Sequence, residues 1–178
     1  QAPVLALTAT ATPEVVRDIQ KQLNFREEYV LSKSFRRDNL AYVVRKVNNK
    51  LDELLHILSR VQGSAIVYVR KRDRAEELSR FLNENGIGSD FYHAGLSPLL
   101  REKKQEDWKD NLVRVMVSTN AFGMGIDKPD VRVVVHFDIP DSPEAYFQEA
   151  GRAGRDGQKA YAVLLCNEAT VTALKERI

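Results

Sequence analysis

The amino-acid sequence predicts an α/β protein, with a parallel sheet covered by helices on both faces. Four short runs, at residues 65–69, 113–117, 131–135 and 160–165, are largely apolar, which is typical of strands buried on both sides. Segments with the apolar spacing of amphipathic helices separate most of the strands. Because each crossover between parallel strands lays a helix on one face, this alternation indicates a layered parallel sheet.

The first third of the chain divides at a polar segment. Residues 4–7 and 29–31 are short apolar runs that we expect to form strands. Between them, Thr12 is a good N-cap and Pro13 suits the first position of an amphipathic helix. The polar and basic residues 34–39 then form a linker, so we place a domain boundary between residues 33 and 34.

Beyond this linker, strands and helices alternate. We expect strands at residues 40–47, 65–69, 87–92, 113–117, 131–135 and 160–165. We expect helices at residues 51–61 and 73–85, and three others that begin at Pro98, Pro143 and Asn167. The helix from Pro143 is expected to continue into the arginines near residue 152. Polar or glycine-bearing stretches follow four of the strands, at the carboxyl ends where parallel sheets bind ligands.

Composition sets the class of protein. The 178 residues are 43% hydrophobic and 29% charged, as in a globular protein, and the net charge is only +2. There is no apolar run of membrane-spanning length and no basic signal-peptide start, so the sequence predicts a cytoplasmic protein. The single cysteine, Cys166, rules out an internal disulfide and a cysteine cluster for zinc, and we expect it in a buried strand.

The segment Gln148–Gly157 has the strongest chemical pattern. Its two arginines, Arg152 and Arg155, lie three residues apart and point the same way if the segment is helical. Glycines cost about 1 kcal/mol each in a helix, so Gly151 and Gly154 indicate close approach of the backbone to a neighbour. Two guanidinium groups on such a surface suit a polyphosphate. The alternative is an arginine- and glycine-rich surface turn with solvated charges.

Six segments in order resemble the conserved motifs of superfamily 2 helicases, and of the RecQ group of DNA helicases in particular. They are LALTATAT (5–12), SFRRDNL (34–40), AIVYVRKR (65–72), FYHAGL (91–96), residues 115–140 and QEAGRAGRDG (148–157). The resemblance implies the tail of a first RecA-like lobe at residues 1–33 and a complete second RecA-like lobe at residues 34–178. It also implies an ATP-dependent 3′–5′ DNA helicase that acts in DNA repair, recombination and replication.

The departures from the family pattern limit what this chain can do alone. It has no GxxxxGK[ST] sequence and no DExH box; the nearest match, LDELLH at 51–56, has the wrong spacing and lies on an amphipathic helix. We therefore expect ATP and Mg²⁺ to be held mostly by a first lobe outside this chain, and no zinc or other metal site within it. The chain resembles a piece of a longer protein, inactive on its own, that works with that first lobe and with zinc-binding and winged-helix domains.

The resemblance also implies roles at a nucleotide site. Arg155 would be the arginine finger on the γ-phosphate, Arg152 its companion, and Gln148 a residue that orients the attacking water or senses the phosphate. Gly125 and Asp127 would approach the ribose and relay the nucleotide state. Asp127 also fits a plain turn before a lysine and a proline.

The resemblance implies that DNA binds to loops on the rim of the lobe opposite the nucleotide residues. The expected partner is single-stranded and partly duplex DNA, and no membrane contact is expected. The candidates are Arg70, Arg72, His93, Gly95, Ser118 and Thr119. His93 equally fits a structural hydrogen bond. Thr8 and Thr10 would couple ATP closure to strand movement, and Trp108, Tyr146 and Phe147 are expected in the core. Two alternatives remain: a lobe of an RNA-dependent ATPase, and a nucleic-acid-binding module without turnover.

Overall fold

The computed structural model describes residues 4–8, 11–27, 29–32, 36–123, 126–168, 170 and 172. The chain forms two compact units, unit 1 with residues 1–37 and unit 2 with residues 38–178, and each is described by itself. The boundary expected between residues 33 and 34 falls among residues 33–35, which lie outside the described residues. The division at that point therefore stays a prediction.

Unit 1 contains the helix that the sequence predicts. Helix α1 spans Pro13–Gln22, and the side chain of Thr12 accepts a hydrogen bond from Val15 N at 3.4 Å. Pro13 occupies the first turn and Glu14 complements the positive end of the helix dipole. The helix start is thus set by its cap, as the sequence indicates.

The two short strands expected in unit 1 are not formed. Residues 4–8 and 29–32 are irregular, and Val4, Leu5 and Leu31 are exposed. A strand is stabilised by hydrogen bonds to a neighbouring strand, and the described part of unit 1 contains no strand to pair with. An apolar run alone was therefore too weak a basis for predicting strands here.

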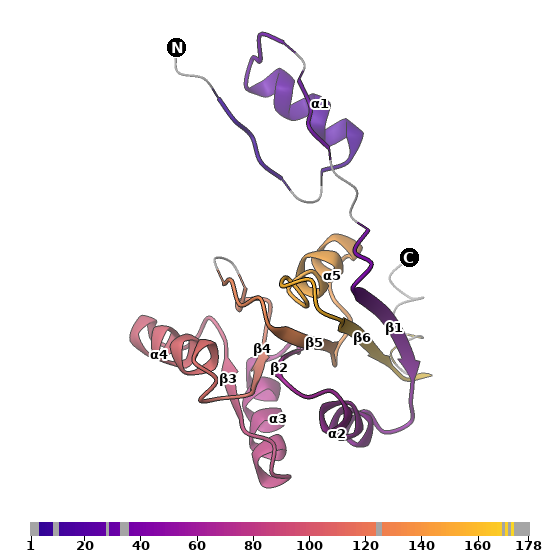
Figure 1. Ribbon diagram of the computed structural model, residues 1–178, viewed down its shortest axis with the longest axis vertical. Coiled ribbons are helices and arrows are strands. Elements are labelled where there is room, and N and C mark those ends of the chain that lie inside the picture. The colour runs from indigo at the N-terminus through magenta and orange to yellow at the C-terminus, as the bar shows by residue number, and fades with distance from the viewer. Residues whose placement is uncertain are drawn as a thin grey trace. The chain divides into compact units, whose positions relative to one another are not determined.

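Unit 2 is built on a six-stranded sheet in the order β1-β6-β5-β2-β4-β3 (Figure 1). All neighbouring strands are parallel, which confirms the predicted fold class. The strands are β1 Leu40–Lys46, β2 Ser64–Tyr68, β3 Ser89–Tyr92, β4 Val115–Ser118, β5 Val131–His136 and β6 Ala160–Cys166. Cys166 is buried in β6, as expected.

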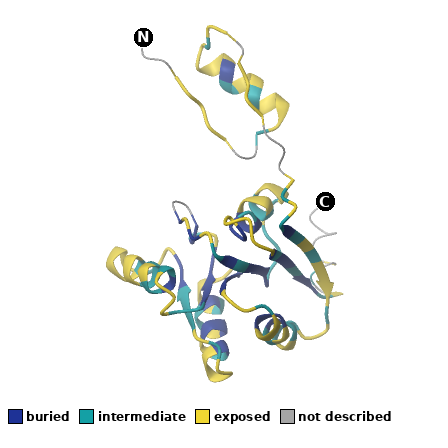
Figure 2. Cartoon of the chain, in the orientation of Figure 1, coloured by how far each residue is buried: buried dark blue, intermediate teal, exposed yellow. Residues whose placement is uncertain are grey.

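Helices cover both faces of this sheet. Side chains of α2 (Lys50–Arg60) and α3 (Arg72–Glu84) pack on one face against alternate strand residues such as Val67. On the other face, α4 (Pro98–Lys109) and α5 (Pro143–Ala150) pack with the next residues along, such as Ile66. The central strands are therefore buried on both sides (Figure 2). Ser97 and Ser142 cap α4 and α5 with side-chain hydrogen bonds, followed by prolines in the first turn.

The arginine segment after α5 is not helical, contrary to the prediction. Helix α5 ends at Ala150, and residues 151–156 form consecutive turns. Gly154 has φ +63°, which favours glycine and interrupts a right-handed helix. The helix expected from Asn167 lies largely outside the described residues, although Glu168, Thr170 and Thr172 are helical.

Different candidate site residues lie at the two ends of the parallel strands. We call these ends the carboxyl edge and the amino edge of the sheet. Helix α5 runs back from the carboxyl ends of the strands, so the segment after it lies at their amino ends. There Gly154 N donates to Val131 O at 2.8 Å and Ala160 N donates to Asn39 O at 2.9 Å. The polar and glycine-bearing stretches after β2, β3, β4 and β5 thus lie at the carboxyl edge, whereas the arginine segment lies at the amino edge, a position that the sequence analysis did not predict.

Candidate nucleotide and strand sites

Arg155 lies at the amino edge with its guanidinium accessible. Its Nη1 donates to Asp127 Oδ1 at 2.8 Å and to Ile126 O at 3.2 Å. The side chains of Arg155 and Asp127 are 36% and 79% exposed. Ion pairs at such exposure contribute about 0.2–1 kcal/mol, so a phosphate competes easily for this guanidinium.

Arg152 lies beside Arg155 in sequence but is buried. Its Nη1 donates to the carbonyl oxygen of Gly123 at 2.5 Å, and a Cβ at Gly123, which has φ +147°, would overlap the guanidinium. The neighbouring Tyr68 hydroxyl donates to Phe122 O at 2.9 Å, and burial raises the pKa of Tyr68, so that hydroxyl stays protonated. Arg152 therefore binds the backbone of the loop that contains Gly123. Its role beside the γ-phosphate stays a prediction.

These contacts involve one long loop, residues 119–130, which we call the crossing loop. It leaves β4 at the carboxyl edge and enters β5 at the amino edge. Residues 124 and 125 lie outside the described part, so the expected role of Gly125 is untested. Arg152 holds the middle of the crossing loop and Arg155 holds its later part. The loop thus joins the two edges of the sheet.

Lys128 in this loop is a structural residue that the sequence analysis missed. Its Nζ donates to Lys109 O and Asn111 Oδ1, each at 2.9 Å, and lies 3.1 Å from Asp130 Oδ1. The side chain is buried above the ring of Trp108. A lysine in a turn sequence gives no sign of such burial, because its acceptors come from distant parts of the chain.

Gly154 packs closely against two other segments of unit 2. A Cβ there would lie 2.7 Å from Asn39 Nδ2 and 2.8 Å from the Cβ of Ala160. Asn39 Nδ2 also donates to Gly154 O at 2.7 Å and to Gln158 O at 2.8 Å. The glycine-rich pattern therefore reflects close packing on the starts of β1 and β6. Asn39 is a second structural residue that the sequence analysis missed.

The remaining residues predicted to touch or sense nucleotide are only partly placed. Gln148 is exposed on α5. Thr8 is exposed in unit 1, and Thr10 lies outside the described residues. Among the aromatic residues expected in the core, Trp108 is fully buried, whereas Phe147 is 53% exposed and Tyr146 is half-buried. The prediction for Phe147 was wrong, because its ring lies at the edge of the sheet, 5.8 Å from the ring of the exposed Tyr42 in β1.

At the carboxyl edge, Arg70 and Arg72 are exposed beside the ends of the strands. Arg70 N donates to Asp138 Oδ2 at 3.0 Å, and its guanidinium pairs with Asp141. Arg70, Asp138 and Asp141 line a pocket of about 160 Å³. Arg72 begins α3, and a Cβ at Gly95 would lie 3.0 Å from its Nη1. Arg72 and Gly95 therefore share one surface.

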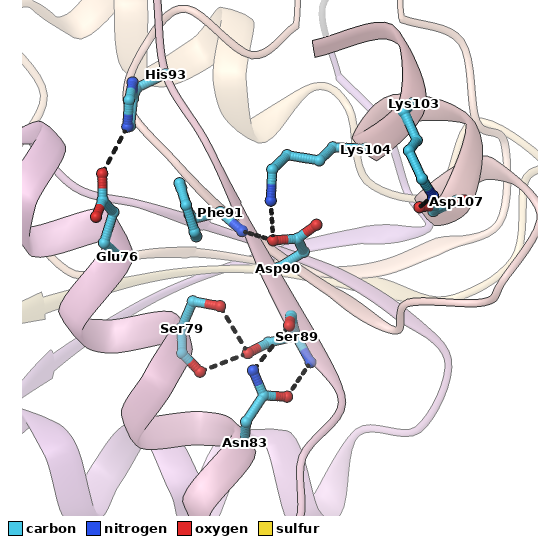
Figure 3. Close-up of polar contacts among 10 residues, drawn as sticks. All are labelled: Glu76, Ser79, Asn83, Ser89, Asp90, Phe91, His93, Lys103, Lys104 and Asp107. Carbon is cyan, nitrogen blue, oxygen red and sulfur yellow. Dashed lines mark hydrogen bonds and ion pairs between the residues drawn. The ribbon is translucent and has the colours of Figure 1, made fainter. Parts of the chain in front are cut away.

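His93 has a structural hydrogen bond at each ring nitrogen, and Figure 3 shows the one to Glu76. Gly95 N donates to His93 Nδ1 at 3.2 Å, so Nε2 carries the proton of the neutral ring. Nε2 then donates to Glu76 Oε1, 3.0 Å away. The side chain is buried, and of the two interpretations left open for His93 the structure favours the structural one. This arrangement fixes the loop that presents Gly95.

Ser118 and Thr119 are less accessible than expected. Ser118 is fully buried, and its hydroxyl oxygen lies 2.7 Å from the carbonyl oxygens of Tyr92 and Thr119. Thr119 is also buried, and its amide donates to Tyr92 O at 3.3 Å. The Ser118 hydroxyl does not lie on the surface, because it satisfies carbonyls at the end of the sheet. Both residues fix the start of the crossing loop beside β3.

Within the described residues, no group of three or more His, Cys, Asp or Glu side chains is arranged to hold a metal ion. None of the helices in the described part is both long and apolar enough to cross a bilayer.

Known proteins resemble this chain in sequence and fold. A family model described as the helicase conserved C-terminal domain matches residues 46–157. The RecQ-like DNA helicase blm-1 of Caenorhabditis elegans is 42% identical over 92% of this chain and 17% of its own length. The ATP-dependent DNA helicase RecQ of Bacillus subtilis is 44% identical over 91% of this chain and 28% of its own length. The chain therefore spans less than a third of either relative.

A solved structure shows the same fold. The Saccharomyces cerevisiae Dbp5 L327V protein, bound to Gle1 H337R and IP6, superposes with a TM-score of 0.78. It covers 96% of this chain and 46% of its own, at 24% sequence identity, so this likeness concerns the fold alone. Together with the parallel sheet, it confirms the predicted RecA-like architecture. The chain belongs to the family of helicase conserved C-terminal domains, and the two relatives named above, at 42% and 44% identity, are RecQ-type DNA helicases.

Proposed function

We propose that this chain is the second motor lobe of an ATP-dependent 3′–5′ DNA helicase, which moves along single-stranded DNA and separates duplexes. The observation that carries the proposal is the crossing loop. It starts beside the candidate strand-binding residues at the carboxyl edge and ends at the candidate arginine finger at the amino edge. A single segment in contact with both sites is suited to couple phosphate chemistry to strand movement.

At the amino edge, Arg155 is the proposed arginine finger. Its guanidinium is partly exposed and is held by the mostly solvated carboxylate of Asp127 and by the carbonyl oxygen of Ile126. ATP supplies a γ-phosphoryl group whose oxygens gain charge in the transition state, and an arginine at that position accelerates transfer about 10³–10⁵-fold. The described residues offer no carboxylate cluster for Mg²⁺, so we assign the metal and most of the nucleotide to the first lobe. Gln148, Gly125 and Asp127 are proposed to complete this side of the site.

At the carboxyl edge, the proposed strand contacts are the guanidinium groups of Arg70 and Arg72 and the exposed backbone at Gly95. Contacts to phosphates give affinity without reading sequence, which suits a motor that moves along any strand. The buried residues His93, Ser118 and Thr119 hold the loops that form this surface through their hydrogen bonds to Gly95 and Tyr92. Thr8 and Thr10 are proposed to couple the first lobe to the same movement.

The proposal is tested by ATP hydrolysis with the full-length protein that contains both lobes. We expect single-stranded DNA to stimulate turnover, and Arg155→Ala to reduce it by at least about 10³-fold. Arg80→Ala, an exposed arginine on α3, is the matched control and should leave turnover unchanged. Stronger stimulation by RNA than by DNA would assign the protein to the RNA-dependent ATPases. Strand binding without hydrolysis would make it a non-catalytic nucleic-acid-binding module.

A further inference from the structure

An exposed leucine pair stands at the carboxyl edge, beside the proposed strand contacts. Leu99 is 76% exposed and Leu100 is 46% exposed, both in the first turn of α4. The helix follows directly on the loop that carries Gly95, and Ser97 fixes its start by accepting a hydrogen bond from Leu100 N at 3.4 Å. The leucines are therefore held in an ordered turn.

The contacts of α4 place this turn at the sheet edge. One turn further into the helix, Lys104 pairs with Asp90 of β3 and its ammonium lies 4.0 Å from the centre of the Phe91 ring (Figure 3). Still one turn further, Trp108 is buried in the core. Leu100 continues the same row toward the carboxyl end, about 5 Å beyond Lys104, where β3 ends and its loop begins.

The charges around the leucines favour an anionic partner. Two of the three lysines of α4 are neutralised, because Lys103 pairs with Asp107 at 2.7 Å and Lys104 pairs with Asp90 (Figure 3). The third, Lys109, is the last residue of the helix, away from the leucines. Arg72 and Arg101, in contrast, form no ion pair with any of the described residues, and Arg101 Nε is buried without a hydrogen-bond partner among them. Arg72 lies beside Gly95, Arg101 follows Leu100 directly in the sequence, and the exposed Glu102 is the acidic residue next to them. An apolar turn at the same edge as two unpaired guanidinium groups matches a single strand, which offers phosphates beside apolar base faces.

We propose that Leu99 and Leu100 form an apolar contact surface for the bases of a single nucleic-acid strand whose phosphates bind Arg72 and Arg101. This inference rests on the proposed function, since it assumes that the strand follows the carboxyl edge. It adds a contact to the bases where the other residues at this edge contact only phosphates. Leucine side chains can fill this role because every base has an apolar face, whatever its sequence.

The chain offers a matched control in Leu112. It is 75% exposed, almost the same as Leu99, but it follows the other end of α4. Its neighbour Asn111 accepts a hydrogen bond from Ser64, the first residue of β2, which places this turn at the amino edge. The two leucines are thus separated by the length of the helix, about 18 Å.

The test measures binding of the chain to an unstructured thymidine dodecamer by fluorescence anisotropy, over a series of salt concentrations. We expect Leu99→Ala with Leu100→Ala to weaken binding on the order of three- to tenfold, and Leu112→Ala to leave it unchanged. The slope of log affinity against log salt should stay the same in the leucine variant, because no phosphate contact is lost. In Arg72→Ala the slope should become shallower by about 0.7.

A dodecamer of abasic sites, with the same number of phosphates, separates base contact from other effects. We expect the leucine variant and the unmodified chain to bind it equally. A leucine variant that binds thymidine as tightly as the Leu112 variant does, or that loses affinity equally for both dodecamers, would overturn the inference. So would a change in sedimentation on substitution, which would assign the leucines to contact with a second copy. Failure of both Arg72→Ala and the leucine variant to weaken binding would instead contradict the strand-binding edge itself.

Discussion

The guanidinium of Arg152 donates a hydrogen bond to the carbonyl oxygen of Gly123, 2.5 Å away, in the buried interior of the second lobe. Arg155, three residues along, instead holds an exposed carboxylate of the same loop. Two arginines of one motif therefore differ in what they do for the protein. One fixes the crossing loop, and the other is accessible at its end.

This difference predicts opposite effects on stability. Arg152→Met leaves the buried carbonyl of Gly123 without its donor, which costs about 1–3 kcal/mol. For a domain of this size the melting temperature should fall by several degrees. Arg155→Met, at an exposed pair, should change it little. Calorimetry of the two variants decides, and equal melting temperatures would show that Arg152 has no anchoring role.

Lys128 should be a stability residue despite its charge. Its buried ammonium donates to Lys109 O and Asn111 Oδ1, and hydrogen bonds to charged groups contribute about 1.5–3 kcal/mol each. We expect Lys128→Ala to lower the midpoint of urea unfolding substantially, because it also leaves these two acceptors without a donor and removes packing over Trp108. Lys71→Ala, at an exposed lysine, is the control. An unchanged midpoint for Lys128→Ala would mean that the ammonium is not held as described.

Asp156 should contribute to the acid sensitivity of unit 2. The hydrogen bond from Arg132, 2.5 Å long, lowers the pKa of the Asp156 carboxyl below its ordinary value of 3.8. A lowered pKa in the folded state stabilises the protein above pH 3.8, and this contribution is lost as the pH falls through the folded-state pKa. Asp156→Asn should therefore lose less stability than the unmodified chain between about pH 4 and pH 2. Urea unfolding across that range measures it, and parallel curves for the two proteins would contradict the assignment.

Much of unit 2 could be predicted because its signals are local. Ser97 and Ser142 cap helices just before prolines, and the strand predicted at residues 131–135 is largely apolar. Such patterns depend on neighbours within a few residues, and the structure confirms them. The run at residues 4–7 failed as a strand because pairing needs a partner that sequence alone does not supply.

The site was harder to predict for a physical reason. Arg152 binds a carbonyl 29 residues earlier in the chain, and Gly123 leaves room for it only because it lacks a side chain. The sequence indicates arginines near glycines but not which arginine is buried. Ser118 was expected to contact the nucleic acid because its segment resembles a helicase motif, whereas here its hydroxyl is buried against the carbonyls of Tyr92 and Thr119.

The central claim is that the crossing loop couples the strand edge to the nucleotide edge, and Gly123→Ala tests it most directly. A Cβ at Gly123 displaces the guanidinium of Arg152 and loosens the loop, while Arg155 and the proposed strand-binding residues are unchanged. ATP hydrolysis by the full-length protein should be measured with and without single-stranded DNA. We predict basal hydrolysis close to that of the unmodified protein and a loss of most of the stimulation by DNA. Full stimulation in this variant would contradict the account.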